Sequence, residues 1–497
     1  MPLMNAFDPA ALECLAALAD AGSFERAAIQ PAPAPAPHTA PSLNSYESVH
    51  AAMLARMNVE AMRPRDVDIP RAFALDRMRA LVKALGDPQA SYRVVHVAGS
   101  KGKGSVCEMT ASALLACGCA VGLYTSPHLL DARERIRINQ RPISPEEFTV
   151  LGRRVLQAAA KLPKKLGEAT YFEVLTALAL LYFAEQAVDI AVVEVGMGGL
   201  VDATNVVSAD VSVVTSVHLE HTEMLGDTLD KIAGHKGGIF KNSSPSLTAV
   251  QDPEVLEVLR ACADAAGSTL AVLTQAGLDF TYRFEASPEL GPHFKVSLST
   301  PTSVFEHVPV PLKGEPQVWN CGLVLAIIDR LRQCGFDLPD ARVSDGLART
   351  PANGRLEVIH KDPRIVIDGA HTKESVQALV RAVGSQMKYD SLVVVFGCHA
   401  DKDVFGMLGA MSMGADKIIF TKATGSQRAA DPRDLQRRFN EISGKMAQAA
   451  PTVKDAINLA ARAVGRGDLI LVTGSFTIAG EAKGLLMEKQ RAAAATA

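Results

Sequence analysis

Short apolar runs rich in valine and isoleucine recur along the chain from Ser45 onward. Each is bounded by Gly, Asp or Ser, which is typical of strands buried on both faces. Longer helical patterns lie between them, including Val106–Cys117 and Glu173–Glu185. The alternation predicts an α/β fold of mostly parallel sheets covered by helices. The expected strands are Arg93–Ala98, Ile190–Val195, Val211–Val217, Arg364–Ile367, Leu392–Phe396, Ile418–Phe420 and Leu469–Val472.

Other segments depart from that alternation. Asp8–Ala28 predicts one short helix, and the Ala/Pro run Pro31–Pro41 predicts an extended linker. Phe280–Pro311 alternates differently and predicts a small antiparallel insert. Thr350–Gly354, with its proline and glycine, predicts an internal boundary. The expected division is an extension over 1–44, a larger domain over 45–349, a smaller one over 350–490 and a tail over 491–497.

Size and composition exclude several classes of protein. A chain of 497 residues is too long for one ordinary core, so two domains are expected. The net charge of -3 and the aromatic content of 5% give no reason to expect nucleic acid or an anionic membrane as partner. The 8 cysteines lack metal-type pairing, and no stretch is apolar enough to span a bilayer. The acidic N-terminus is unlike a signal peptide, so we expect a cytoplasmic location.

The strongest local signal is a glycine-rich loop between an expected strand and an expected helix. In this loop Gly99, Gly102 and Gly104 let the backbone turn its N–H groups toward an anion, and the helix N-terminus adds partial positive charge. Lys103 would reach the β- and γ-phosphates of a nucleotide, and the hydroxyl of Ser105 would bind Mg²⁺. A glycine-rich turn with solvated lysines is the alternative.

Two further clusters follow expected strands. Glu194 ends the strand at Ile190–Val195, where a carboxylate beside a phosphate loop suits Mg²⁺, although it could equally cap a turn. His218–Asp227, after the strand at Val211–Val217, contains two histidines and several acids. Lone histidines are more often structural than ligating, so this cluster adds modest support.

Together these segments resemble the folylpolyglutamate synthase/dihydrofolate synthase family of the Mur ligase superfamily. The resemblance runs from about Tyr46 to the C-terminus, with the motifs in the family's order. Besides the loop they are Tyr124–Leu129, Glu134–Arg137, Phe172–Glu173, Glu194–Asn205, His221, Leu225–Thr228, Lys236–Lys241, Gly314, Gln317, Asn320, Gly354–Arg355, Asp368–His371, Asp401–Asp403 and Gly474–Ser475. The family implies a Mur-ligase-like architecture, with a P-loop ATPase domain followed by a smaller Rossmann-like domain.

The resemblance also implies roles for single residues. Catalysis would rest on Lys103, Lys236, Arg355 and His371, with Arg355 reaching the ATP phosphates across the domain boundary. One Mg²⁺ would bind Ser105 and Glu194, and a second would bind His221 and a carbamylated Lys236, with K⁺ as a further cofactor. The other implied contacts are Gln317 and Asn320 to the nucleotide, Asp368 to its ribose, and Thr125, Ser126, Pro127, His128 and Asp202 to the pterin or folate.

Some of these roles have a structural alternative. Lys236 could be a solvated lysine at a helix end, Arg355 could pair with Glu357, and Asp368 could cap a turn. The family pattern favours the functional role in each case. The chain departs from the residues that the family commonly has at Lys101, Leu200, Glu220, Pro316 and Thr372. None of these changes removes a metal or phosphate ligand.

The implied activity is an ATP-dependent ligase that joins L-glutamate to a carboxylate through an acyl phosphate. The carboxylate would be dihydropteroate, the γ-carboxylate of a folate, or both, and a monomer is expected. Two alternatives remain from other classes: a Mur-type ligase acting on another acceptor such as a UDP-sugar peptide, and a nucleotide-binding regulator without catalysis.

Overall fold

An eight-stranded sheet lies at the centre of the larger domain. The computed structural model describes residues 43–63 and 66–496, so the expected helix at Asp8–Ala28 and the linker at Pro31–Pro41 lie outside it. The strand order is β4-β3-β2-β5-β1-β6-β7-β8, and the six strands from β2 to β8 run parallel. The strands are β1 (Arg93–Ala98), β2 (Val121–Tyr124), β3 (Ile136–Ile138), β4 (Arg141–Pro142), β5 (Ile190–Glu194), β6 (Val211–Val214), β7 (Pro245–Thr248) and β8 (Thr269–Val272).

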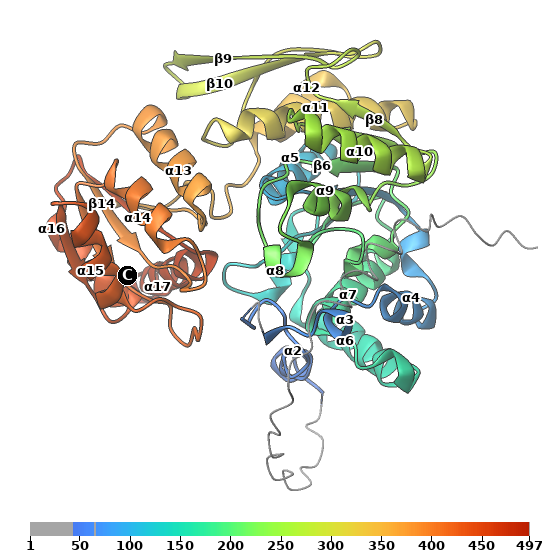
Figure 1. Cartoon of the computed structure of the whole chain (residues 1–497), viewed down its shortest axis with the longest axis horizontal. Coiled ribbons are helices and arrows are strands. Elements are labelled where there is room, and N and C mark those ends of the chain that lie inside the picture. The colour runs from blue at the N-terminus through green and yellow to red at the C-terminus, as the bar shows by residue number, and fades with distance from the viewer. Residues whose placement is uncertain (1–42, 64–65, 497) are drawn as a thin grey trace, which may run out of the picture. The chain divides into compact units, whose positions relative to one another are not determined.

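Helices cover both faces of this sheet (Figure 1). The apolar residues of β1, β2, β5 and β6 divide between separate cores, as expected for strands buried on both sides. One core includes α5 (Lys103–Ala116), α11 (Pro316–Gln333) and α12 (Asp340–Ala348). The other cores include α2 (Tyr46–Leu54), α4 (Leu75–Ala84), α6 (Pro145–Ala160), α7 (Tyr171–Glu185), α9 (Leu229–Gly237) and α10 (Pro253–Ala266). The short helices are α3 (Ile69–Ala72) and α8 (Thr222–Leu225).

The expected insert is a separate three-stranded antiparallel sheet in the order β11-β10-β9. Its strands are β9 (Asp279–Ser287), β10 (Gly291–Ser299) and β11 (Val304–Pro309). Phe280 on β9 packs against Trp319 of α11, with ring centroids 5.4 Å apart. The insert therefore shares the core that contains the phosphate-loop helix α5.

A second sheet, six-stranded in the order β12-β13-β17-β14-β15-β16, forms the C-terminal domain. All neighbours run parallel except β12 and β13. The strands are β12 (Glu357–Lys361), β13 (Arg364–Ile367), β14 (Leu392–Phe396), β15 (Lys417–Phe420), β16 (Met446–Ala449) and β17 (Leu469–Thr473). Its helices are α13 (Lys373–Gln386), α14 (Val404–Ser412) and α15 (Pro432–Ile442) around one core, and α16 (Val453–Ala463) and α17 (Phe476–Thr496) around the other.

The prediction of parallel α/β sheets is confirmed, and most differences lie at element ends. The helix after the loop begins at Lys103, earlier than the expected Val106, because Gly102 caps it. The expected strand at Val211–Val217 ends at Val214, because Thr215 and Ser216 bond to the phosphate loop instead. Within the described residues no helix is long and apolar enough to cross a membrane.

Candidate active site

The loop between β1 and α5 is shaped by its own backbone and by the end of β6. Gly99 and Gly102 have φ of 147° and 90°, a region that side chains with a Cβ rarely adopt. Ser216 receives the backbone N–H of Lys101 at its Oγ, 3.0 Å away, and that of Ser100 at its carbonyl, 2.8 Å away. Lys103 Nζ donates to the Gly99 carbonyl at 2.9 Å. Lys103, the lysine predicted to hold the phosphates, therefore lies against the backbone of its own loop.

Close contacts bring four of the other predicted residues to this loop. A Cβ on Gly102 would collide with Asn320 Oδ1, and Asn320 in turn donates to Gln317 Oε1 at 2.9 Å. A Cβ on Gly104 would collide with Nη2 of Arg355 and would lie 3.4 Å from Glu194 Oε2. A side chain at either position would displace Asn320 or Arg355 from the loop. The structure therefore gathers Gln317, Asn320, Arg355 and Glu194 around the start of α5.

Arg355 comes from the segment that joins the two domains. Its Nη1 donates to the Asn353 carbonyl at 3.1 Å. The alternative pairing with Glu357 is not formed, because Glu357 receives the Gly354 N–H at 2.8 Å and Lys483 Nζ at 2.6 Å. The guanidinium is left facing the phosphate loop, which is where the resemblance places it.

Ser105 and Glu194 fit a magnesium ion. Both are buried, and Glu194 Oε2 receives a hydrogen bond from the Ser126 N–H at 2.9 Å. Burial raises the pKa of Glu194, and the nearby cations Lys103 and Arg355 oppose that rise. Glu194 approaches Gly104, the residue before Ser105, so a carboxylate and a hydroxyl of the kind that Mg²⁺ prefers are both available here, and nucleotide phosphates would complete the shell. The described part of the chain contains no group of three His, Cys, Asp or Glu residues that could hold a metal ion.

Lys236 is not a solvated lysine. Its side chain is 1% exposed, and Nζ lies 2.9 Å from Glu220 Oε1. Burial lowers the pKa of Lys236 to about 8, whereas the same ion pair and the neighbouring lysines hold the pKa of Glu220 low against the effect of burial. An ammonium group cannot bind a cation, so unmodified Lys236 does not fit as a metal ligand. His221, next to Glu220, has a pKa lowered to about 4 by burial and is therefore neutral near pH 7.

Asp368 and His371 lie at the end of β13. Asp368 accepts the Leu356 N–H at 2.9 Å and the Ala370 N–H at 2.8 Å, so it does hold the turn, as the structural alternative stated. Burial raises its pKa to about 6. His371 Nδ1 lies 2.7 Å from the Gly369 carbonyl, and burial lowers its pKa to about 3. A neutral imidazole that donates from Nδ1 leaves Nε2 as a free acceptor.

Known proteins place the chain in a family. The model of the Mur ligase middle domain matches residues 97–328, and that of the Mur ligase glutamate ligase domain matches 354–476. A Bacillus subtilis dihydrofolate synthase/folylpolyglutamate synthase is 35% identical over 81% of this chain and 92% of its own length. A protein of the same name from Mycobacterium tuberculosis is 34% identical, covering 83% and 90%. The chain belongs to the folylpolyglutamate synthase/dihydrofolate synthase family of Mur ligases.

Solved structures of the family share the fold. Mycobacterium tuberculosis folylpolyglutamate synthase complexed with ADP has a TM-score of 0.79 and 32% identity, covering 89% of this chain and 98% of that one. Escherichia coli FolC in complex with DHPP and ADP has a TM-score of 0.76 and 26% identity, covering 90% and 98%. The similarity to these family members spans both domains.

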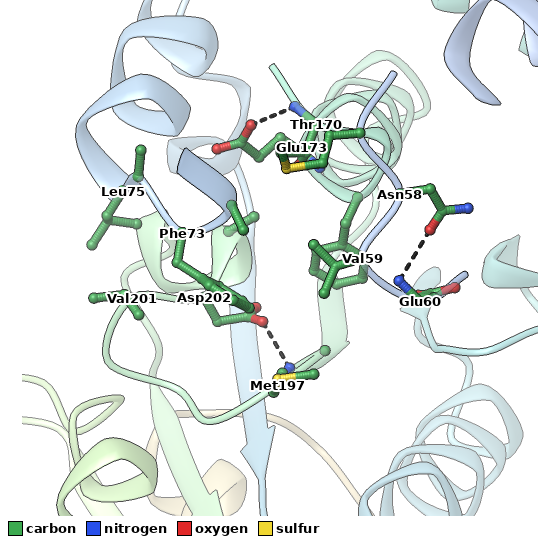
Figure 2. A pocket seen from close by; sticks show the side chains of 16 residues that line it. Asn58, Val59, Glu60, Phe73, Leu75, Thr170, Glu173, Met197, Val201 and Asp202 are labelled. Atoms are coloured by element: carbon green, nitrogen blue, oxygen red, sulfur yellow. Dashed lines mark hydrogen bonds between the residues drawn. The ribbon is translucent and has the colours of Figure 1, made fainter. Parts of the chain in front are cut away.

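A pocket lies next to the turn that follows Glu194, and Gly196, two residues further on, is one of its lining residues. Figure 2 shows its walls, with Asp202 bonded to the backbone of Met197, 2.9 Å from Oδ2 to N. Asp202 also accepts the N–H of Thr204 at 3.0 Å, so this buried carboxylate orders the turn as well as lining the pocket. The remaining lining residues come from 57–60, 72–75, Thr170, Phe172, Glu173, Gly196, Val201 and Ala203.

The other predicted substrate residues lie beside this pocket and are not among its lining residues. Thr125, Ser126 and His128 are partly buried, and Pro127 is exposed after a cis peptide bond. His128 Nδ1 accepts from Arg135 Nε at 2.9 Å, and Arg135 binds both carboxylate oxygens of Glu60 at 2.7 and 2.6 Å. Glu60 lines the pocket, so the predicted loop is connected to it through Arg135.

Several of these partners cannot be identified from the sequence. Neither Glu60 nor Glu108 is a predicted site residue, and Glu220 stands out only as a departure from the family. The acid Glu220 is separated by 16 residues from Lys236, and Glu60 by 75 from Arg135. A signal existed for Arg135, which lies in the Glu134–Arg137 motif, but none identified the acid that pairs with it.

Proposed function

We propose that the chain is an ATP-dependent ligase that adds L-glutamate to dihydropteroate, to the γ-carboxylate of a folate, or to both. The observation that carries the proposal is the position of Arg355, from the linker, over the phosphate loop and beside Glu194. The acceptor pocket begins just past Glu194, so nucleotide and carboxylate would meet at one strand end. Relatives named for both activities favour a bifunctional enzyme.

The reaction joins two anions before it joins an acid to an amine. A carboxylate oxygen of the acceptor attacks the γ-phosphorus of ATP, the bond to ADP breaks, and an acyl phosphate forms. Lys103 and Arg355 offset the repulsion and stabilise charge on the transferring group. Bound Mg²⁺ at Ser105 and Glu194 would supply further charge neutralisation.

The second step forms the amide. The amine of L-glutamate attacks the acyl carbon, phosphate leaves with the carboxylate oxygen, and the amine loses a proton. His371, neutral with Nε2 unprotonated, can accept a hydrogen bond from that amine and orient it. Asp368, which fastens the linker by way of Leu356, would also contact the ribose as the family pattern implies.

A second cation site requires modification of Lys236. The amine of this buried lysine has a lowered pKa, so a neutral fraction is available to react with CO₂ and form a carbamate. The carbamate would place a second anion next to Glu220, and a second Mg²⁺ bound with His221 would neutralise the pair. Carbon-13 NMR with labelled bicarbonate should show a carbamate signal that is absent in Lys236→Arg; its absence from the wild type would refute the modification.

The acceptor can be assigned with purified protein, ATP, Mg²⁺, K⁺ and L-glutamate. We expect phosphate release with 7,8-dihydropteroate and with tetrahydrofolate, and products heavier by one glutamyl residue in each case. Release with only one acceptor would assign a single activity. Release with neither, from protein that binds ATP, would overturn the folate proposal and favour another Mur-type acceptor or a regulator. We further propose a monomer in the cytoplasm, with K⁺ as an activating cofactor, to be tested by light scattering and by omission of K⁺.

A further inference from the structure

Glu108 is a buried carboxylate that the proposed reaction does not use. It lies in α5, one turn beyond the phosphate loop, and is 2% exposed. Arg137 binds both of its oxygens, with Nη1 3.1 Å from Oε2. The same carboxylate also accepts Nδ2 of Asn353 at 3.0 Å, across 245 residues of sequence. A buried charge needs such partners, and here one of them comes from the interdomain linker.

Asn353 connects this carboxylate to Arg355. Its side chain donates to Glu108 while its carbonyl accepts Nη1 of Arg355 at 3.1 Å. Its φ of 41° lies in the left-handed region, which asparagine adopts more readily than most residues. The far end of the turn is held separately, by the bond from the Leu356 N–H to Asp368. The linker is therefore fastened to both domains, with Arg355 between the two attachments.

We propose that Asn353 and Glu108 are positioning residues that hold Arg355 over the phosphate loop. The inference rests on the proposed function, because Arg355 matters only if a phosphoryl group is bound there. An arginine side chain has several rotatable bonds, and a displacement of about 1 Å can reduce catalysis by as much as 10²-fold. The bond to Asn353 removes part of that freedom before the nucleotide arrives.

The same network reaches the acceptor side. Arg137 Nη2 donates to Thr125 Oγ1 at 3.3 Å as well as pairing with Glu108. Thr125 precedes Ser126, whose N–H binds Glu194. One buried pair thus contacts the phosphate-loop helix, the acceptor loop and the linker, so disturbance of the linker should affect turnover more than nucleotide affinity.

The decisive variant is Asn353→Gly, which removes the side-chain bond and keeps a backbone that accepts positive φ. We expect kcat to fall about 10-fold, with less than a threefold change in KM for ATP. The matched control is Asn139→Gly, since Asn139 at the turn between β3 and β4 is also left-handed (φ 50°), and its Oδ1 accepts the Val121 N–H at 2.9 Å, so this variant too loses one side-chain hydrogen bond but none to Glu108. Its kcat should stay within twofold of wild type, and both variants should keep a Tm within a few degrees of wild type.

A double-mutant cycle separates positioning from general structural damage. In an Arg355→Ala background, Asn353→Gly should change kcat by less than twofold, because the group it positions is already gone. A further 10-fold loss in that background, or full activity of Asn353→Gly alone, would overturn the proposal.

If the wild-type protein shows no ligase activity, the inference can still be tested by binding. Calorimetry would measure the affinity of each variant for a non-hydrolysable ATP analogue. Arg355→Ala should then weaken binding, and Asn353→Gly should weaken it by a smaller factor only when Arg355 is present. That pattern would support the positioning role while the proposed ligase activity failed. Equal weakening in both backgrounds would contradict it.

Discussion

The phosphate loop and the linker that carries Arg355 face the same site but are held in different ways. The loop lies within one domain, where Gly99 and Gly102 have positive φ and Ser216, just after β6, receives two N–H groups. The linker is held by two carboxylates, Glu108 from one domain and Asp368 from the other. One half of the site is therefore formed within a single domain, and the other depends on the domains being in contact.

The largest effect should come from the half of the site that is formed within one domain. Lys103→Ala removes the cation proposed to hold the phosphates and should lower kcat by about 10²–10³-fold. Glutamate-dependent phosphate release measures this loss. Lys165→Ala, an exposed lysine after α6, is the matched control and should retain wild-type activity. Activity of Lys103→Ala within threefold of wild type would show that the loop does not bind phosphates as proposed.

The second-largest effect on activity is expected for Arg355→Ala. Its kcat should be about 10²-fold lower, with little change in the free energy of unfolding. Arg355→Lys should recover only part of the activity, because an ammonium lacks the planar fork that can donate to Asn353 and to a phosphate at the same time. The same phosphate-release assay compares the two. Equal activity of the lysine variant and the wild type would mean that charge alone suffices and that the linker geometry is unimportant.

A smaller effect is expected at the other attachment of the linker. Asp368→Asn should destabilise the fold by about 1–3 kcal/mol, because an amide nitrogen cannot accept one of the two backbone N–H groups held now. Urea unfolding followed by far-UV circular dichroism measures it, since the helices and strands of the C-terminal domain contribute to that signal. Asp416→Asn is the control, since Asp416 accepts one backbone N–H, from Leu392, and an asparagine oxygen can replace it. Equal destabilisation of both variants would mean that the two hydrogen bonds accepted by Asp368 contribute no more than the single bond accepted by Asp416.

The smallest expected effect is on the pH dependence of stability, and it comes from His96 in β1, the strand that leads into the phosphate loop. His96 on β1 is fully buried, 2.9 Å from Thr204 Oγ1, and burial lowers its pKa to about 3. The unfolded chain, with a histidine pKa near 6.5, binds more protons below that pH, so stability falls as pH drops from about 6.5 toward 3. Between pH 7.5 and 5.5 His96 should account for about 1.4 kcal/mol of lost stability.

His96→Gln should show a pH dependence of unfolding free energy smaller by that amount, whatever its stability at pH 7.5. Urea titrations of both proteins at the two pH values give the comparison. An unchanged pH dependence would mean that His96 is not held neutral in the folded protein.

The same contrast explains how much could be predicted from sequence. The strand Arg93–Ala98 was predicted with its observed ends, because an apolar run bounded by a glycine-rich loop is a local signal. Strand order and loop chemistry also predict a site at Lys103, Ser105 and Glu194, and the structure brings Glu194 to the start of α5, where the other two residues lie. The family resemblance supplied Arg355, which no local pattern indicated.

What could not be predicted are the partners of charged groups. Glu108 with Asn353, Glu60 with Arg135 and the bond from Arg428 to the Glu60 carbonyl each join residues far apart in sequence. Asp202 and Asp368 were assigned to ligands, and the structure shows that both also hold their own turns. Propensity and periodicity do not determine such pairings, which depend on how the sheets pack and on where the two domains touch.

We expect the acceptor carboxylate to be phosphorylated at the site between Lys103 and Arg355. The most direct test uses dihydropteroate labelled with oxygen-18 in its carboxylate, together with ATP, L-glutamate and Mg²⁺, and mass spectrometry of the released phosphate. Transfer through an acyl phosphate predicts one labelled oxygen in each phosphate formed, at a rate reduced in Lys103→Ala and Arg355→Ala alike. Glutamate-dependent release of unlabelled phosphate would contradict the account, because the carboxylate would then not have been the phosphoryl acceptor.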